Sequence, residues 1–375
     1  MKDLTLIATT NFGLEAVTKR ELQDLGFEDL QGSDGKIEFS ASIEDIPKAN
    51  LRLRSAERIL LKLGEFPART FEELFDRTYQ LDWVSLLPEQ ANFIVQGRSV
   101  KSKLFSISDC QRIVEKAIIK KLQTKYRREW FEKSGSRYKI EVSLFKDMAT
   151  ITLDTSGEGL HKRGYRERNF KAPISETIAA SLVLLSFWNK DRLLADPFCG
   201  SGTIPIEAAM IGKNIPPGLM RPFDFEGFSF IDPNILKREK KRCYEEIRYD
   251  ETLEILASDL SYRAIEIART NAEILGLEED IQFFQKDVAQ LELPDDYGVL
   301  ITNPPYGIRI GEKEVQALNF ELGQLYQSIP SWSFYIITAS ESFERDFGKK
   351  SHRNRKLYNG RIKSYYYQYY GPKPQ

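Results

Sequence analysis

The sequence predicts an α/β protein in which a doubly wound, mostly parallel sheet follows two smaller α+β units. Two features lead to this fold class. After residue 173, short apolar runs of strand length alternate with amphipathic runs of helix length, which is typical of a parallel sheet covered by helices on both faces. Before residue 155, paired strand patterns are mixed with helices, which is typical of α+β units.

Length and composition limit the class of protein. A chain of 375 residues is too long for one compact core, and 41% hydrophobic with 29% charged residues is ordinary for a soluble globular protein. The longest apolar stretch, 178–188, is shorter than the ~20 residues that span a bilayer, and no signal pattern begins the chain. We therefore expect a cytoplasmic protein without a membrane partner. Three distant cysteines and two histidines predict neither disulfides nor a metal site.

Residues 1–156 are expected to form the two α+β units, one at 1–65 and one at 66–156. Alternating apolar residues predict strands at 4–9, 36–39, 58–63, 93–100, 138–145 and 149–154. Helical spacing and capping residues predict helices at 14–25, 43–51, 71–79 and 107–126. The last two strands read as a hairpin around Lys146-Asp147.

Small flexible residues at 155–159 mark the best boundary, and a basic linker is expected at 157–172. The sheet domain at 173–375 then takes strands at 192–195, 254–257, 281–285, 298–302, 334–338 and 365–370. Its predicted helices are 175–187, 203–211 and 263–275. The long segment 212–250 is expected to be an insertion over the active face.

Charge is unevenly distributed although the net charge is −1. Basic residues concentrate in 101–171 and again in 345–363, and such clusters raise the affinity for phosphate through counterion release. A solvated helical surface is the plainer explanation for one cluster; two clusters around the sheet domain favour a polyanion. The candidate residues for binding this polyanion are Lys120, Lys121, Arg127, Arg128, Lys162, Arg163 and Arg166.

A glycine turn, Asp196-Pro-Phe-Cys-Gly-Ser-Gly-Thr203, follows the predicted strand 192–195. Glycines permit backbone angles closed to other residues and allow a ligand to approach the main chain. The turn lacks the third glycine of a dinucleotide fingerprint and the Gly-Lys-Ser/Thr ending of a P-loop, so a nucleoside cofactor without a pyrophosphate fits better. A tight turn without a ligand is the alternative. Its candidate cofactor residues are Asp196, Pro197, Phe198, Gly200, Gly202 and Thr203.

Two further acids are predicted at strand ends, where ligands bind in open α/β sheets. Asp259 follows the strand 254–257 and is suited to accept hydrogen bonds from both hydroxyls of a ribose. Asp287 follows the strand 281–285 and is suited to accept from an adenine amino group. A helix cap is the alternative for a single aspartate at such a place, and it stays open for Asp259.

The tetrapeptide Asn303-Pro-Pro-Tyr306 is the most specific motif in the chain. The two prolines restrict the backbone, and the Asn303 amide oxygen with the Pro304 carbonyl can accept both hydrogens of an exocyclic amine. Tyr306 can stack on a flipped base, which stabilises it by about 1–3 kcal/mol. With Pro305, these residues are the candidate catalytic group for methyl transfer to a nucleobase nitrogen. A proline turn after a strand is the alternative.

The glycine turn and the tetrapeptide resemble the cofactor loop and the catalytic motif of class I S-adenosylmethionine-dependent amino-methyltransferases. Nearly the whole chain resembles the THUMP-containing RNA guanine-N2 methyltransferases, with further similar stretches at 161–166, 172–177 and 355–360. Bacterial members act on 23S ribosomal RNA, and relatives act on tRNA.

The resemblance implies a Rossmann-like class I methyltransferase domain at 173–375, a ferredoxin-like domain at 1–65 and a THUMP RNA-binding domain at 66–156. It implies S-adenosylmethionine as methyl donor, S-adenosylhomocysteine as product, RNA as the partner and no obligatory protein partner. Glu176 is expected near the methionine end of the cofactor. The expected activity is methylation of a guanine N2 amine in structured RNA, with 23S rRNA favoured.

Other functions stay open. The substrate of a guanine methyltransferase could be tRNA, and the tetrapeptide would also fit adenine N6 in DNA or RNA. A non-catalytic ribosome-assembly protein with a vestigial cofactor pocket is the alternative outside enzymes. Cys199 could activate a pyrimidine ring as a nucleophile, but it lies inside the cofactor loop and we expect it to be a packed residue.

Overall fold

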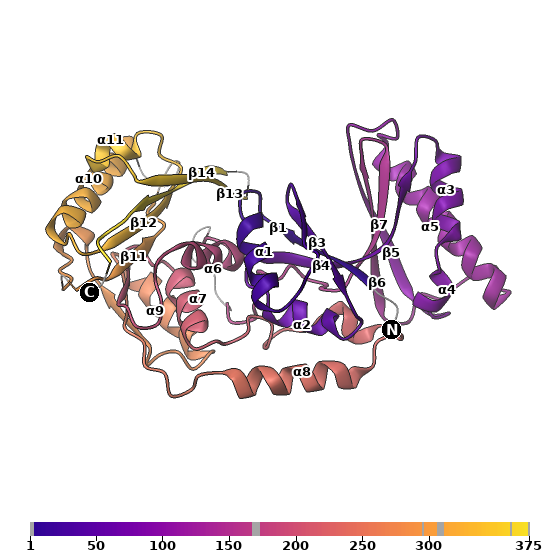
Figure 1. The fold of residues 1–375 in the computed structure, drawn as a ribbon, viewed down its shortest axis with the longest axis horizontal. Helices are drawn as coiled ribbons and strands as arrows, with labels where there is room; N and C mark the ends of the chain where they lie inside the picture. The colour runs from indigo at the N-terminus through magenta and orange to yellow at the C-terminus, as the bar shows by residue number, and fades with distance from the viewer. Residues whose placement is uncertain (1–3, 167–172, 295, 306–310, 361, 374–375) are drawn as a thin grey trace. The chain divides into compact units, whose positions relative to one another are not determined.

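A computed structural model describes residues 4–166, 173–294, 296–305, 311–360 and 362–373 (Figure 1). The chain divides into two compact units. The N-terminal unit comprises Met1–Thr10, Lys19–Leu160 and Arg221–Arg242, and the C-terminal unit comprises Asn11–Thr18, His161–Met220 and Cys243–Gln375. The domain boundaries expected at residues 65, 156 and 172 stay predictions.

The N-terminal unit contains a seven-stranded sheet in the order β2-β3-β1-β4-β7-β6-β5. Its strands are β1 (Leu4–Thr10), β2 (Gln31–Ser33), β3 (Lys36–Ala41), β4 (Ala56–Pro67), β5 (Asn92–Val100), β6 (Arg137–Phe145) and β7 (Met148–Asp154). The helices that follow these strands in sequence are α1 (Glu15–Asp24), α2 (Asp45–Arg52), α3 (Phe71–Gln80), α4 (Trp83–Leu86) and α5 (Ile107–Tyr126). All the elements predicted in 1–156 are present, while β2 and α4 were not predicted.

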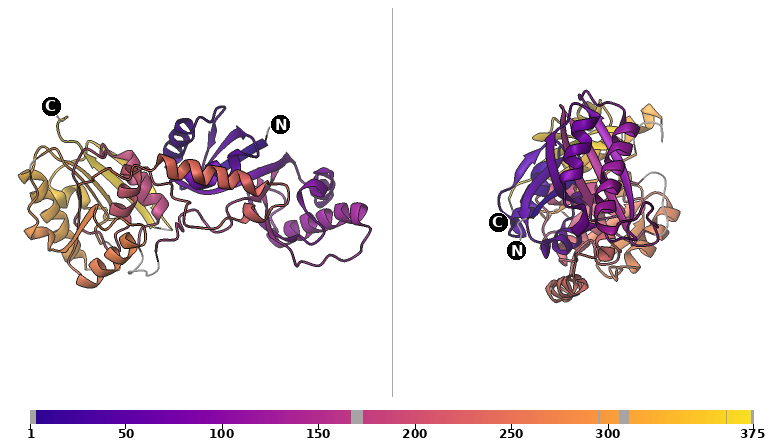
Figure 2. Two further views of the ribbon diagram at one scale, coloured as in Figure 1. Left: turned by 90° about the horizontal axis from the view of Figure 1, so that it is seen from below. Right: turned by 90° about the vertical axis from the view of Figure 1, so that its right-hand side faces the viewer.

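Helix α5 illustrates how the sequence directs this unit. Its buried side chains recur every three or four residues, which gives one apolar stripe along a helix: Cys110, Val114, Ala117, Ile118 and Leu122. The helix ends where Arg127 takes a left-handed conformation with φ of 52°. Figure 2 shows α5, in purple, beside the strands of its sheet. The stripe faces the sheet, so the lysines of the opposite face stay in solvent.

The C-terminal unit contains a second seven-stranded sheet in the order β10-β9-β8-β11-β12-β14-β13. Its strands are β8 (Leu194–Asp196), β9 (Ile255–Asp259), β10 (Ile281–Gln285), β11 (Val299–Thr302), β12 (Ser333–Thr338), β13 (Arg353–Asn359) and β14 (Ile362–Tyr369). The first five strands in this order pair in parallel, and β14 and β13 are antiparallel. The predicted mostly parallel, doubly wound sheet is confirmed.

Helices cover both faces of this sheet (Figure 1). They are α6 (Glu176–Leu185), α7 (Thr203–Gly212), α9 (Tyr262–Glu273), α10 (Glu312–Ser328) and α11 (Phe343–Phe347). One apolar cluster joins the sheet to α6, α7 and α9, through residues such as Leu182, Ile206 and Ala268. A second joins it to α10 and α11, through Leu322 and Phe347. Helices α10 and α11 and strand β13 were not predicted.

Two segments pack with a different unit from the residues that flank them in the sequence. The stretch Arg221–Arg242, with η1 (Asp224–Gly227) and most of α8 (Pro233–Glu246), belongs to the N-terminal unit. There the Arg221 guanidinium donates to the carbonyls of Gly159 and Glu158, and the rings of Tyr138 and Phe228 stack at 4.7 Å. These residues therefore pack with the N-terminal unit, whereas the sequence assigned them to the sheet domain; their expected place over the active face stays a prediction. Conversely, Asn11–Thr18 packs with the C-terminal unit.

None of the helices in the described part of the chain is both long and apolar enough to cross a bilayer.

Candidate active site

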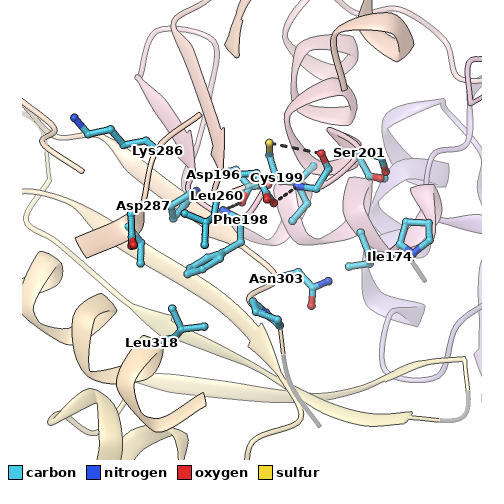
Figure 3. A pocket seen from close by; sticks show the side chains of 18 of the residues that line it. Ile174, Asp196, Phe198, Cys199, Ser201, Leu260, Lys286, Asp287, Asn303 and Leu318 are labelled. Carbon is cyan, nitrogen blue, oxygen red and sulfur yellow. Dashed lines mark hydrogen bonds between the residues drawn. The ribbon is translucent and has the colours of Figure 1, made fainter. Parts of the chain in front are cut away.

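The chain order of the second sheet reverses between β8 and β11. Strands β9 and β10 lie on one side of β8, and β11 and β12 lie on the other. Such a switch point opens a crevice at the carboxyl ends of the strands, and ligands of open α/β sheets bind there. A pocket of about 810 Å³ occupies this place (Figure 3).

Most of the predicted cofactor and catalytic residues line this one pocket. They are Asp196, Pro197, Phe198, Gly200, Thr203, Asp259, Asp287, Asn303 and Pro305. Gly202 and Pro304 are buried, and the residues on either side of each in the sequence line the pocket. Tyr306 lies outside the described residues. Figure 3 shows Asp287, Phe198, Asn303 and Ile174 along the pocket, with Leu318 projecting from α10.

The glycine turn after β8 has two glycines with different roles. Both are left-handed, with φ of 54° at Gly200 and 80° at Gly202, a conformation that other residues adopt at a cost. A Cβ at Gly200 would meet no atom within 4 Å, so this position leaves open space in the pocket. A Cβ at Gly202 would lie 3.0 Å from the Cβ of Ala268, so this position allows close packing on α9.

Asp196, at the end of β8, is a buried carboxyl group. It accepts hydrogen bonds from the Thr302 hydroxyl at 2.6 Å and from the Phe198 backbone N–H at 3.2 Å. Burial raises the pKa of Asp196 to about 7, the two hydrogen bonds lower it in part, and the nearby Asp259 adds to the rise. The carboxyl group is therefore poised between its neutral and charged forms near neutral pH.

Asp259, at the end of β9, contacts the glycine turn. Its two oxygens accept from the backbone N–H groups of Gly200 at 3.0 Å and Ser261 at 2.9 Å. Burial raises the pKa of this carboxyl group, and both hydrogen bonds lower it in part. The side chain of Ser261, not Asp259, caps α9 by accepting from the Ala264 N–H. The capping alternative therefore does not account for Asp259.

Asp287, which follows β10, both caps a short helix and lines the pocket. Its carboxylate accepts from the Ala289 N–H at 3.0 Å and so caps the short helix η2 (Val288–Gln290). It also lines the pocket. Capping uses Oδ1, so the second oxygen of the carboxylate is a candidate acceptor for a ligand.

Asn303, directly after β11, carries the most informative atom of the site. Its Oδ1 is buried and accepts no hydrogen bond from any residue within the described ranges. Leaving a buried acceptor unsatisfied costs about 1–3 kcal/mol, so such atoms are rare unless a ligand or water supplies the donor. The atom belongs to a pocket-lining residue, which suits an acceptor for an incoming amine.

Glu176, a predicted cofactor residue, does not itself line the pocket; with Arg166 it forms an ion pair next to the lining residues Ile174 and Thr203. Glu176 is buried in the first turn of α6, and its Oε1 lies 3.4 Å from Nε of Arg166. Burial raises the pKa of Glu176, and the Arg166 charge lowers it in part. The Arg166 guanidinium also donates to the Thr203 hydroxyl at 2.7 Å and the Ile174 carbonyl at 3.3 Å. Arg166 therefore joins three segments around the pocket.

Arg163 is placed differently from the other basic candidates. It is 2% exposed and its Nε lies 3.3 Å from Oε1 of Glu207, which is itself fully buried. The Tyr165 hydroxyl donates to the same oxygen at 3.3 Å. An RNA phosphate needs an accessible donor, so the burial of Arg163 does not support its predicted RNA-binding role. Lys162, by contrast, is exposed.

The remaining basic candidates cluster at the end of α5, in the N-terminal unit. We call this group the α5 cluster: Lys120, Lys121, Arg127 and Arg128. Lys121 is half-buried with its ammonium 4.9 Å above the ring of Tyr79, and Arg128 pairs with Glu89 at 2.6 Å. The other two side chains are exposed. Surface ion pairs of this kind are weak, so the charges stay available to a polyanion.

Cys199 lies inside the glycine turn and is 6% exposed. Burial, together with the charges of Asp196 and Asp259, raises the pKa of this thiol well above its ordinary value. The sulfur is therefore held as a thiol, which is a poor nucleophile, and this agrees with a packing role.

Sequence reasoning missed the wall that α10 contributes, namely Glu314, Ala317 and Leu318. A signal was present, because Val315, Leu322 and Tyr326 are apolar at helical spacing and the Glu314 carboxylate accepts from the Gly311 N–H at the start of the helix. Leu260 and Lys286, each beside a predicted aspartate, were missed as well.

Comparisons with known proteins agree with this arrangement. Residues 163–368 match the family described as the RMKL-like methyltransferase domain. Residues 5–60 match the RlmL ferredoxin-like domain, and residues 68–154 match the THUMP domain.

Two curated relatives align over most of the chain. YpsC of Bacillus subtilis (strain 168), named as an RNA methyltransferase, is 48% identical over 373 residues, which cover 99% of this chain and 97% of YpsC. The tRNA (guanine(6)-N2)-methyltransferase of Methanocaldococcus jannaschii is 34% identical over 351 residues, which cover 90% of this chain and 91% of that protein.

Two solved structures share the fold throughout. SMU.472, described as a methyltransferase and crystallised with SAH, superposes with a TM-score of 0.94 at 44% identity, covering 100% of both chains. A Listeria monocytogenes protein, described as a predicted N6-adenine-specific DNA methylase, superposes with a TM-score of 0.95 at 46% identity, covering 99% of this chain and 97% of that one. The fold is that of S-adenosylmethionine-dependent methyltransferases, and the chain belongs to the THUMP-containing class I RNA methyltransferases.

Proposed function

We propose that this protein transfers a methyl group from S-adenosylmethionine to the exocyclic N2 amine of a guanine in structured RNA. The observation that carries the proposal is the buried, unsatisfied Oδ1 of Asn303, which lies in the same pocket as the glycine turn and the strand-end carboxylates. An acceptor of this kind suits an amine, which brings two donors. The guanine N2 assignment is supported by the relative named tRNA (guanine(6)-N2)-methyltransferase.

The pocket residues fit the cofactor. Gly200 leaves open space beside the main chain, where a nucleoside can approach. Asp259 would hold the ribose hydroxyls, Asp287 the adenine amine, and Glu176 with Arg166 the wall near the methionine end. When bound, S-adenosylmethionine supplies an electrophilic methyl group.

The chain's own contribution would be positioning and pre-set acceptors. Oδ1 of Asn303 and the carbonyl of Pro304 would accept the two amine hydrogens and orient the nitrogen. Tyr306, outside the described residues, would stack on the base. A methylated ring amine loses its proton readily to solvent, so no side chain is needed as a strong base.

The RNA itself would be held by the α5 cluster and Lys162, with the THUMP domain as the binding module. We favour 23S rRNA because the chain resembles the THUMP-containing RNA guanine-N2 methyltransferases, whose bacterial members act on 23S rRNA. The second candidate is tRNA, because the archaeal relative is named for it.

Labelled methyl transfer tests this proposal. The purified protein is incubated with labelled S-adenosylmethionine and with ribosomal RNA, tRNA or DNA, and the nucleosides are then identified by mass spectrometry. We expect label in RNA as N2-methylguanosine, and loss of the same nucleoside from cells that lack the gene. Label as N6-methyladenosine, or label only in DNA, would contradict the guanine assignment.

A further inference from the structure

We propose that the β13–β14 hairpin is a single-stranded RNA-binding platform that holds nucleotides next to the base in the pocket; this rests on the proposed function. The platform consists of Lys356 and Tyr358 on β13 and Lys363 and Tyr365 on β14. Its place at the rim of the active site, its alternation of rings and charges, and its exposure carry the inference.

The topology places the end of the hairpin at the rim that holds the pocket. Strand β12 runs parallel to β11, so its last residue, Thr338, lies at the same edge of the sheet as Asn303. Thr338 pairs with Tyr365 of β14, so the residues from 362 to 364 extend beyond the carboxyl end of β12. Strand β14 lies two strands from β11, a backbone separation of roughly 10 Å. Nucleotides that flank a bound base can span this separation.

The four side chains lie on one face of the hairpin, where lysines and tyrosines alternate both along each strand and across the pair. Lys356 pairs with Tyr365, and Tyr358 pairs with Lys363, so each strand contributes one ring and one ammonium. Residues that face each other in an antiparallel pair, and residues two apart on a strand, point to the same side. The ammonium of Lys356 lies 5.3 Å from the Tyr358 ring centroid, and that of Lys363 lies 5.1 Å from the Tyr365 centroid.

The charges of the platform are available to a ligand. Both lysines are exposed. The Lys363 ammonium interacts with the Tyr365 hydroxyl and with the charge of Glu341. The two rings are half-buried, so each has support behind it. Phe12, which is 51% exposed, extends the aromatic surface with its ring 6.1 Å from that of Tyr358.

This combination fits single-stranded RNA better than other partners. Aromatic faces stack on bases, while lysines between them contact the phosphates that join those bases. A duplex hides its base faces and would use only the lysines. Lysines on the edge strand β13 also deter sheet-to-sheet aggregation, but that role requires no rings between them.

Paired variants test the platform. Tyr358→Leu with Tyr365→Leu removes the rings and keeps apolar bulk, while Tyr358→Phe with Tyr365→Phe keeps the rings as a matched control. Binding of a short fluorescein-labelled single-stranded RNA, and of a duplex with the same sequence, is measured by anisotropy. We expect the leucine pair to lose at least about tenfold in affinity for the single strand, and the phenylalanine pair to bind like the wild type.

A second pair isolates charge. Lys356→Gln with Lys363→Gln should reduce the slope of log affinity against log salt by about 1.4 for the single strand. Lys190→Gln is the control, because Lys190 precedes β8 at the opposite rim of the sheet and already pairs with Asp191 and Glu251. SAH affinity, measured by calorimetry, should be unchanged in every variant and shows that the C-terminal unit is folded.

The outcomes separate this inference from the proposed function. Wild-type affinity in both the leucine and the glutamine pairs would overturn the platform, even if methyl transfer to RNA is normal. An equal loss of single-strand and duplex affinity in the leucine pair would also overturn it, because stacking would not explain that result. If the leucine pair fails to bind SAH, the glutamine pair decides alone. Loss of binding in a protein that never methylates RNA would retain the platform and reject the proposed function.

Discussion

The carboxyl group of Asp196 should make the C-terminal unit less stable as the pH rises from about 4 to about 7. Burial raises its pKa from the ordinary 3.8 to about 7, so the folded state keeps a proton that the unfolded state has already released. Between these two values each pH unit costs about 1.4 kcal/mol of unfolding free energy, and above pH 7 the penalty stays constant near 4 kcal/mol. From pH 5 to pH 8 the loss is about 3 kcal/mol.

Asp196→Asn tests this reasoning because the amide cannot ionise but keeps an oxygen for the Thr302 hydroxyl and the Phe198 N–H. The stability of the variant relative to the wild type should rise by about 3 kcal/mol between pH 5 and pH 8. In a unit of about 200 residues this corresponds to a melting temperature difference that grows by about 5–10 °C. Scanning calorimetry of the ligand-free protein measures it, with the two units followed as separate transitions where they resolve.

Asp191→Asn is the matched control, because the Asp191 side chain is 73% exposed and carries only a surface ion pair with Lys190. Its melting temperature difference from the wild type should change little over the same pH range. The reasoning is refuted if Asp196→Asn shows an equally flat profile, because the carboxyl group would then not be desolvated in the folded state.

Four further outcomes are expected. Asn303→Ala should reduce turnover by orders of magnitude, with SAH affinity near normal in calorimetry and no loss of stability, because the removed acceptor is unsatisfied; unchanged turnover would exclude it from catalysis. Gly202→Ala should lower the melting temperature more than Gly200→Ala, because of the contact with α9, whereas Gly200→Ala should chiefly weaken SAH binding. Arg163→Met should lower the free energy of unfolding, measured with denaturant, by about 3–5 kcal/mol, because it leaves the buried Glu207 carboxylate without its partner. Adding Glu207→Leu removes that carboxylate and should restore part of the loss. If the effects of the two substitutions simply add, the ion pair does not stabilise the fold in this way. Neutralising the α5 cluster should weaken RNA binding and flatten its salt dependence, and an unchanged salt slope would mean that its charges are only solvated.

Local patterns predicted most of the elements because their causes are local. The predicted ends of helix α5 agree with the observed ones. Its apolar residues recur at helical spacing, and the helix lies between Ser106 and Arg127, which cap its two ends. The strands that carry the site were predicted because each is a short apolar run before a polar residue. Strand β13 was missed because RNRKLYN is mostly charged and polar, and its single fully buried residue, Leu357, leaves no alternation to detect.

The candidate site was predictable to the extent that its motifs are contiguous. The glycine turn and the Asn303 motif are each encoded in a few adjacent residues. The α10 wall was missed with its helix, and Arg166 was grouped with surface cations because charge density in a sequence does not distinguish an exposed guanidinium from one paired with Glu176. The burial of Arg163 was equally undetectable, since its partner Glu207 is distant in sequence.

The sequence alone determined the parallel sheet, the strand ends and the chemical types of the site residues, since periodicity and turn chemistry act over a few neighbouring positions. Only the tertiary structure decided the strand order that brings Asp196, Asp259, Asp287 and Asn303 into one pocket. It also decided the raised pKa of Asp196, the unsatisfied oxygen of Asn303 and the packing of Arg221–Arg242 with the N-terminal unit. These properties depend on desolvation and on contacts between distant segments, and both arise only when the chain is folded.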